Sequence, residues 1–305
     1  MTDLTKAIYT DTDAAREHLE SLRWANGIFC PHCGGTEKIT KLEGKSTRPG
    51  VYKCNDCRSP FSVTVGTVFE RSKIPLNKWL LAAQLMAASK KGISSHQIHR
   101  MLGVTYKTAW FMTHRLREAM TSEGGMLGGN GGPVEVDETY WGTSKPKGKT
   151  ARGYEHKMKI VSLVERDGNK RTFRVASVNE KTIRPILDAQ LSKKARLMTD
   201  EAKVYMNAGR QFAEHGIVNH SAKEYARGDV TTNSVESSFA LLKRGLIGTF
   251  HKVSEVHLQR YATEFDFRWN YRAKMGYTDD MRAEALLKGI EGKRLMYVQP
   301  NPKTA

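Results

Sequence analysis

The chain has 305 residues, enough for two or three domains and a sizeable core. Lysine and arginine number 49 against 32 aspartate and glutamate, which gives a formal net charge of +17 and a pI near 9.7. This excess favours a polyanionic partner, either nucleic acid or an anionic membrane surface. No run of about 18 apolar residues occurs, and the polar N-terminus lacks a signal-peptide apolar stretch. We therefore expect a cytoplasmic protein without membrane association.

The first part of the chain is expected to hold three small units. Residues 1–23 form an N-terminal helix in this interpretation, because apolar residues recur at helical spacing between Ala14 and Leu22. Residues 24–70 contain all four cysteines in a compact segment. Residues 71–123 are expected to be helical, with Pro75 in a first helical turn.

A glycine-rich stretch at residues 124–133 is expected to be a linker, because its six glycines make a regular element costly. Beyond it the pattern predicts three strands, a helix, one or two further strands and then long helices. A hairpin turn is expected at Asp167-Gly168-Asn169. This order predicts a mixed α/β domain over residues 134–291, followed by a polar tail at 292–305.

The cysteines form two C-x₂-C pairs, Cys30 with Cys33 and Cys54 with Cys57, separated by 20 residues. Two tight turns that each carry two thiolates suit tetrahedral Zn²⁺. Four buried free cysteines and an iron–sulfur cluster are the alternatives, but paired turns a hairpin length apart favour zinc. Because all four ligands are cysteines, the expected site is closed and structural.

Residues 92–110 are typical of a helix-turn-helix. Ser94 or Ser95 can cap the first helix, Gly103 fits the turn, and Thr105 begins the second helix. The N-terminal end of a recognition helix meets base edges, so we expect DNA contacts there, with phosphate contacts further along. An ordinary helical hairpin with a basic face is the alternative. The expected DNA-binding residues are Thr105, Tyr106, Lys107, Thr108, Arg115 and Arg117.

Acidic residues occur in a strand, at a strand end and at a helix start. Asp137 lies in the strand, Asp200 follows a short apolar run, and Glu236 begins a helix that also carries Lys243 seven residues later. Such carboxylates can converge at one sheet edge and hold two Mg²⁺ ions, which would clamp the oxygens of an in-line phosphodiester displacement. The rivals are Glu135 and Glu138 for the first position and Glu201 for the second. For His220 we favour a hydrogen-bonding role over catalysis.

Four motifs together resemble prokaryotic insertion-sequence transposases that have an N-terminal zinc ribbon and a DDE core of ribonuclease H-like fold. They are Cys30-Pro31-His32-Cys33, Val136-Asp137-Glu138-Thr139-Tyr140, Met198-Thr199-Asp200 and the segment from Thr232 to Arg244. The resemblance implies Asp137, Asp200 and Glu236 as ligands of Mg²⁺ or Mn²⁺, and Lys243 as a lysine that contacts DNA. Some members carry Asn at the third acidic position, whereas this chain has Glu236.

A basic loop follows the first acidic motif and would bind the DNA backbone beside a phosphodiester site. Its cationic residues are Lys145, Lys147, Lys149 and Arg152. The expected function is a DNA transposase that binds inverted terminal repeats, cleaves strands and transfers them to a target. By family analogy, synapsis of two ends implies a homo-oligomer. The alternatives are a DNA-binding regulator derived from a transposase and a nuclease that lacks strand transfer.

Overall fold

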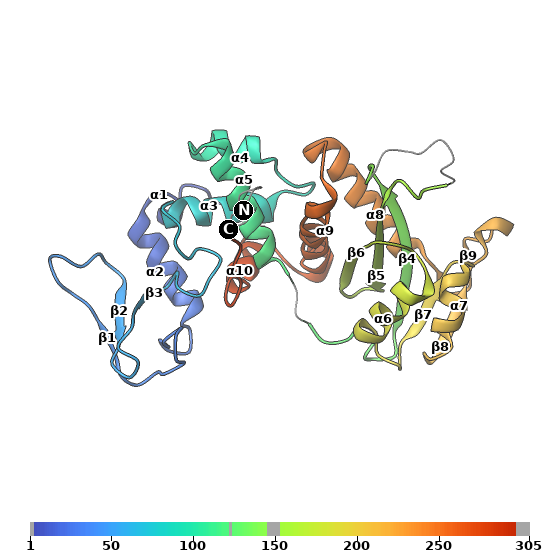
Figure 1. Cartoon of the computed structure of the whole chain (residues 1–305), viewed down its shortest axis with the longest axis horizontal. Helices are drawn as coiled ribbons and strands as arrows, with labels where there is room; N and C mark the ends of the chain where they lie inside the picture. Colours follow the sequence, from blue (N-terminus) through green and yellow to red (C-terminus); the bar gives the residue numbers. More distant parts are fainter. Residues whose placement is uncertain (1–2, 122–123, 145–152, 297–305) are drawn as a thin grey trace, which may run out of the picture. The chain divides into compact units, whose positions relative to one another are not determined.

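The computed structural model describes residues 3–121, 124–144 and 153–296, and the chain divides into two compact units (Figure 1). The first unit combines Met1–Thr121 with Tyr277–Ala305, and the second is Ser122–Gly276. Among the described residues, no helix is long and apolar enough to cross a membrane.

Two helices, α1 (Ala7–Thr10) and α2 (Thr12–Arg23), stand where a single N-terminal helix was expected. Asp11 separates them because its backbone is extended and its side chain accepts a hydrogen bond from the Ala14 amide at 2.7 Å. Asp11 is therefore the N-cap of α2. The apolar positions expected to be buried include Ala15 and Leu19, and both are fully buried.

The cysteine segment folds as a three-stranded antiparallel sheet of β1 (Ile39–Lys41), β2 (Val51–Cys54) and β3 (Pro60–Ser62). Its small core is aromatic: the Tyr52 and Phe61 rings stack, and the Trp24 ring meets each of them edge-on. Such a small sheet buries little apolar surface, so these rings and the cysteines must hold it together.

The rest of the first unit is helical: α3 (Leu76–Ala88), α4 (Ser95–Leu102), α5 (Tyr106–Ala119) and α10 (Asp279–Lys288). The expectation that residues 134–291 form one domain is corrected here, because α10 packs on α3, α2 and α5. Arg282 of α10 donates to the Ala87 carbonyl at 2.8 Å. Gly289 lies so close to the Ala119 carbonyl that a β-carbon would collide with it.

The second unit is built on a five-stranded sheet with the order β6-β5-β4-β7-β8. Strands β4, β5 and β6 are antiparallel, and β4, β7 and β8 are parallel, so the expected mixed α/β architecture is confirmed. Asp167 has a positive φ of 56° in the turn between β5 and β6, where the hairpin was expected. The strands span Pro133–Trp141 (β4), Met158–Glu165 (β5), Lys170–Val175 (β6), Arg196–Thr199 (β7) and Glu214–Ile217 (β8).

Helices cover both faces of this sheet (Figure 1). On one face α6 (Glu180–Gln190) and α7 (Lys203–Gly209) enclose an apolar core; on the other, α8 (Asn233–Gly245) and α9 (Glu255–Asn270) enclose a second core. Sequence analysis did not predict α7. The shorter elements are η1 (His220–Ala222), β9 (Ala226–Arg227), β10 (Val230–Thr231), the π-helical turn η2 (Leu246–Phe250) and η3 (Ala273–Met275).

Side chains of α9 satisfy the outer edge of β6. The Thr172 amide donates to Asp266 at 2.7 Å, and the Arg174 amide donates to Gln259 at 2.7 Å. Asn270 accepts from the Lys170 amide at 2.7 Å and donates back to the Lys170 carbonyl at 3.2 Å. Because the open edge of a sheet is a template for pairing with another strand, α9 protects this one.

The glycine-rich stretch is less independent of the second unit than the linker interpretation predicts. Leu127 is buried and exchanges backbone hydrogen bonds with residues around Leu191. Gly128, at φ +68°, fits so tightly against Ala195 that a β-carbon there would collide. Residues from Leu127 onward therefore belong to the packed second unit, and the linker interpretation is corrected for them.

Candidate metal centres and nucleic-acid interface

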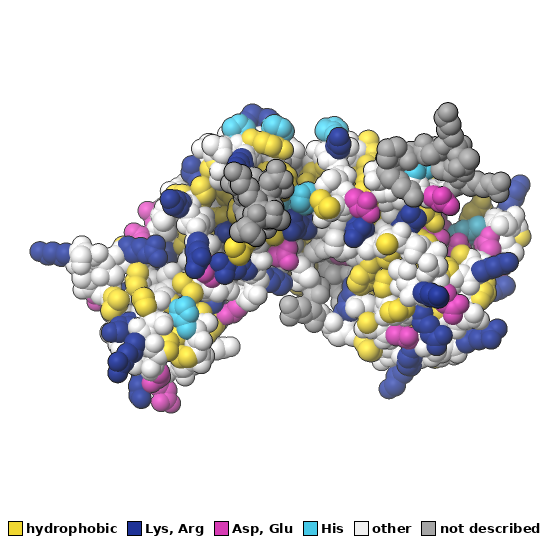
Figure 2. Space-filling model, viewed as in Figure 1, with side chains coloured by type: hydrophobic (Ala, Val, Ile, Leu, Met, Phe, Trp, Pro, Cys, Tyr) yellow, Lys and Arg dark blue, Asp and Glu magenta, His cyan; other side chains and the backbone are white. Residues whose placement is uncertain are grey.

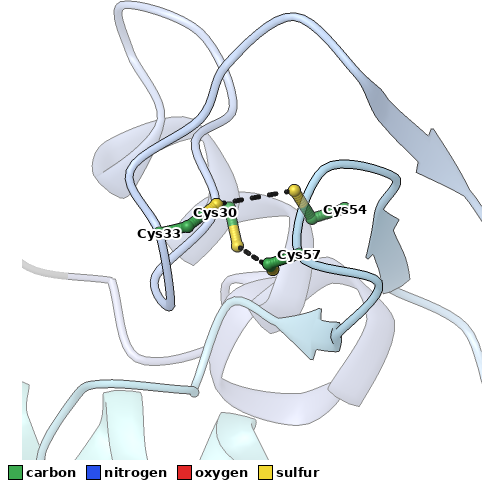
Figure 3. A group of neighbouring side chains, drawn as sticks. All are labelled: Cys30, Cys33, Cys54 and Cys57. Carbon is green, nitrogen blue, oxygen red and sulfur yellow. Dashed lines mark hydrogen bonds between the residues drawn. The ribbon is translucent and has the colours of Figure 1, made fainter.

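The four cysteines come together on two loops of the ribbon, and their side chains point toward one another (Figure 3). The sulfurs of Cys30 and Cys57 lie 3.6 Å apart, and those of Cys33 and Cys54 lie 3.7 Å apart. A regular zinc tetrahedron with Zn–S bonds near 2.3 Å has sulfurs about 3.8 Å apart. The geometry fits one structural Zn²⁺ held by four thiolates.

Backbone turns shape both cysteine pairs. Gly34, at φ +78°, donates its amide to the Cys30 carbonyl at 2.8 Å, as expected for a tight turn. In the second pair, the Ser59 backbone amide is the largest cause that lowers the pKa of Cys57, to about 6. The Gly35 backbone amide lowers the pKa of Cys33, but hydrogen bonds with the neighbouring cysteines outweigh that effect and raise the pKa to about 12, so the four thiols do not share one low pKa.

The helix-turn-helix has the caps that the sequence predicted. Ser94, not Ser95, accepts from the Gln97 amide at 3.2 Å and caps α4. Gly103 takes the left-handed conformation at φ 59°, and Thr105 accepts from the Thr108 amide at 3.2 Å to cap α5. The Thr105 and Thr108 hydroxyls also bond to each other at 2.9 Å.

The N-terminal end of α5 is exposed, as a base-reading surface requires. Tyr106 is 44% exposed and stacks on His96 with ring centroids 4.1 Å apart. Lys107 is exposed and lines a groove of about 310 Å³ together with Arg71 and Lys73. Cationic side chains therefore flank this groove beside the start of α5, and Trp79, Phe111 and Met112 also line it.

Two arginines of α5 do not occupy the positions expected of phosphate contacts, and both expectations are corrected. Arg115 donates to the carbonyls of Val68 at 2.9 Å and Glu70 at 3.1 Å, so it ties α5 to the end of the ribbon. Arg117 is 1% exposed, because other helices of the first unit surround this part of α5. Lys145, Lys147, Lys149 and Arg152 lie outside the described residues.

Strand pairing brings the first two predicted acids together. The parallel register of β4 and β7 pairs Pro133 with Arg196 and Glu135 with Met198, and the same offset carries Asp137 opposite Asp200. Glu236 lies in the first turn of α8, which packs on the face of β4 that Asp137 shares. Asp137, Asp200 and Glu236 are therefore near enough for their charges to influence one another.

Burial and mutual repulsion among the acids dominate the electrostatics of Asp137 and Asp200. Burial, followed by the negative charges of Glu138, Asp200 and Glu236, raises the pKa of Asp137 to about 7. Burial is also the largest cause that raises the pKa of Asp200. Oxygen donors with accumulated negative charge are what a hard divalent cation prefers, so these residues fit Mg²⁺ or Mn²⁺.

The rival Glu135 has a different environment. It is fully buried, and its carboxylate accepts the Ser234 amide at 2.6 Å and the Val235 amide at 3.0 Å. Its other oxygen accepts two bonds from Arg166, at 2.9 and 3.2 Å. Glu135 therefore holds the N-terminus of α8, and with it the position of Glu236.

The other two rivals are also engaged. Glu138 points to the opposite face of β4, where it accepts the Tyr205 hydroxyl at 2.6 Å. Glu201 accepts the His220 amide at 2.9 Å, the Ser221 amide at 3.0 Å and the Ser221 hydroxyl at 2.6 Å. These bonds, the Ser221 hydroxyl first, lower the pKa of Glu201 to about 2.

Two further residues flank the acids. Lys243 is partly exposed two turns along α8 from Glu236. His220 was expected to form hydrogen bonds, and its imidazole also lies beside one of the acids. Its Nε2 is 3.6 Å from Glu236 Oε1. The sequence around His220 does not indicate this position, because the contact with Glu236 is set by the fold.

Comparisons with known proteins agree with this architecture. Residues 128–270 match the ISXO2-like transposase domain, a DDE transposase family, and residues 10–59 match the transposase zinc-ribbon domain. These two matches, a DDE transposase domain and a transposase zinc ribbon in one chain, indicate a transposase.

A similar curated protein is an uncharacterized protein in transposable element ISH50 of Halobacterium salinarum (strain ATCC 700922 / JCM 11081 / NRC-1). It is 29% identical over 275 residues, which cover 85% of this chain and 90% of the relative. No solved structure matches the chain.

Proposed function

We propose that the protein binds the terminal inverted repeats of its element and catalyses metal-dependent strand cleavage and strand transfer. The observation that supports this proposal is the register of β4 and β7, which carries Asp137 opposite Asp200, together with the influence of the Asp200 and Glu236 charges on Asp137. Two divalent cations bound there would supply the clamp on attacking and leaving oxygens that phosphodiester displacement requires.

The protein's own residues then have separate tasks. Asp137, Asp200 and Glu236 hold the cations, and Glu135 keeps the N-terminus of α8 in place beneath them. Lys243, on the same helix, supports the DNA backbone beside the reacting phosphate. Because the acids serve as ligands, the reaction needs no carboxylic acid to transfer a proton.

DNA recognition is assigned to the first unit. The exposed start of α5, with Tyr106 and Lys107, would face base edges, and the groove flanked by Arg71 and Lys73 would contact phosphates. Figure 2 shows Lys and Arg side chains over the visible faces of both units, as the net charge of +17 predicts. In this proposal a homo-oligomer of the protein holds two element ends together.

The test is Glu236→Gln in a gel assay on labelled element ends with Mg²⁺ or Mn²⁺, beside a binding assay. The amide keeps the shape of the side chain but is a poorer ligand, so cleavage and strand transfer should both collapse while end binding survives. Glu255→Gln is the matched control, because Glu255 lies in the first turn of the next helix and forms a partly exposed ion pair with Arg174. Cleavage by Glu236→Gln at the wild-type rate would overturn the proposed ligand set.

A further inference from the structure

His220 lies beside the proposed cation ligands, at the start of η1. Its Nε2 is 3.6 Å from Glu236 Oε1 and 3.4 Å from the Thr232 hydroxyl, which itself donates to Glu236 Oε1 at 3.0 Å. One ligand atom each from Asp200, Glu201 and His220 lie within 4.8 Å of one another. The imidazole is therefore between the end of β7 and the first turn of α8.

The backbone of His220 is fixed by the residue that follows Asp200. Both carboxylate oxygens of Glu201 are used, one on the His220 amide at 2.9 Å and the other on the amide and hydroxyl of Ser221. Asn219 caps the same turn by accepting the Ala222 amide at 3.1 Å. The position of His220 is thus coupled to the strand end that carries Asp200.

The distance between His220 and Glu236 suits a shared ion. Two ligands bound at about 2.1 Å to one small divalent cation lie at most about 4.2 Å apart. The 3.6 Å between His220 Nε2 and Glu236 Oε1 falls within that limit, so both atoms can reach one ion without movement of either backbone. The Tyr225 ring, with its centroid 5.4 Å from that of His220, packs beside the imidazole and restricts its rotation.

We propose that His220 is a nitrogen ligand of the cation centre formed by Asp200 and Glu236, and that it makes this centre prefer Mn²⁺ to Mg²⁺. The inference rests on the proposed function, because it assigns one more ligand to the same centre. Mg²⁺ is held almost entirely by oxygen, whereas imidazole suits transition-metal ions, whose affinity for nitrogen donors exceeds that of Mg²⁺. Glu201 is then a positioning residue that orients the ligand-bearing turn.

The experiment uses the full-length, zinc-loaded protein and Mn²⁺ as a paramagnetic probe. Pulsed electron paramagnetic resonance detects the coupling of Mn²⁺ to ¹⁴N of a bound imidazole, and titration of the free-ion signal gives the Mn²⁺ affinity, with Mg²⁺ added as competitor. Wild type should show the ¹⁴N coupling. In His220→Asn the coupling should vanish, and the Mn²⁺ affinity should fall ~10-fold or more while the Mg²⁺ affinity changes much less.

His251→Asn is the matched control, because His251 is exposed after η2 and its positive φ of 58° suits asparagine. It should keep the coupling and both affinities. His220→Gln provides a second variant with an oxygen donor in place of nitrogen. It should lack the ¹⁴N coupling and reduce the difference between the Mn²⁺ and Mg²⁺ affinities. Circular dichroism and zinc content establish that each variant is folded.

The outcomes separate this inference from the proposed function. Mn²⁺ bound to wild type without ¹⁴N coupling, and with the same Mn²⁺-to-Mg²⁺ preference in His220→Asn, would overturn the role of His220 and leave the carboxylate centre in place. Mn²⁺ that fails to bind wild-type protein beyond the zinc site would overturn the cation centre itself. Coupling that persists in His220→Asn would assign the nitrogen to another histidine and also refute the proposal.

Discussion

Glu135 offers the sharpest test of how the second unit positions its acids. Its fully buried carboxylate accepts four hydrogen bonds, two from the first amides of α8 and two from Arg166. Removal of one partner of a buried charge pair costs about 3–5 kcal/mol. The cost of losing the helix cap is not added to this figure, because the same carboxylate makes all four bonds. Glu135→Ala should therefore destabilise the second unit by about 3–5 kcal/mol.

Scanning calorimetry of the zinc-loaded protein measures this effect. For a unit of this size, each kcal/mol corresponds to roughly 2–4 °C, so the midpoint of the second unit should fall by roughly 6–20 °C. Glu255→Gln, which breaks a partly exposed ion pair with Arg174, should cost less than about 1 kcal/mol. Hydrogen exchange at the Ser234 and Val235 amides should accelerate in Glu135→Ala and stay unchanged in the control.

The milder variant Glu135→Gln distinguishes a structural carboxylate from a ligand. We expect a smaller loss of stability, since the amide oxygen can still accept the α8 amides while its NH₂ group opposes Arg166. Mn²⁺ should still bind to the folded protein. An unchanged midpoint together with loss of Mn²⁺ binding would show that Glu135, rather than Asp137, is the ligand on β4.

Three other predictions concern the rest of the chain. Elemental analysis should find about one zinc per chain, and Cys57→Ser should release it and unfold the ribbon, as a loss of the near-ultraviolet circular dichroism of its aromatic residues would show. Arg115→Ala should lower the melting temperature of the first unit, because Arg115 ties α5 to the end of the ribbon. Lys107→Ala should leave that temperature unchanged and reduce discrimination for element ends by about 1–3 kcal/mol in a binding titration. If both variants weaken DNA binding equally and neither changes the melting temperature, the assignment is contradicted. Asp266→Ala should expose the β6 edge, cost about 3–5 kcal/mol and promote self-association in sedimentation velocity, because Asp266 holds the Thr172 amide and the buried Lys170.

Local sequence patterns predicted the elements that are determined by interactions between residues close in sequence. The helix-turn-helix follows from side-chain caps at Ser94 and Thr105 and from one left-handed glycine at Gly103, all visible in the sequence. The hairpin at Asp167-Gly168 likewise depends only on turn chemistry. The cysteine site is equally direct, since two C-x₂-C turns leave little choice of geometry.

The interpretation of α5 failed where a distant segment decides burial. Ala109, Met112 and Leu116 recur at helical spacing in the sequence, and all three are buried. Arg117 was expected to contact DNA phosphate, but α10 and α3 pack against α5 as well, so α5 is enclosed on more than one face and Arg117 is buried. Nothing near Arg117 in sequence indicates that a helix some 160 residues later returns to the first unit.

The sequence pattern of β4 decides between some of its acidic residues but not between all of them. Period-two alternation along β4 separates Glu138 from Asp137, because they face opposite sides of the sheet, but it leaves Glu135 and Asp137 on one face. Only the position of α8 resolves that pair: its N-terminus meets Glu135, and its first turn brings Glu236 toward Asp137. The parallel register of β4 with β7 then carries Asp200 to the same point. A helix start and a strand register, both set by long-range packing, therefore decide which carboxylates stay available to hold a cation.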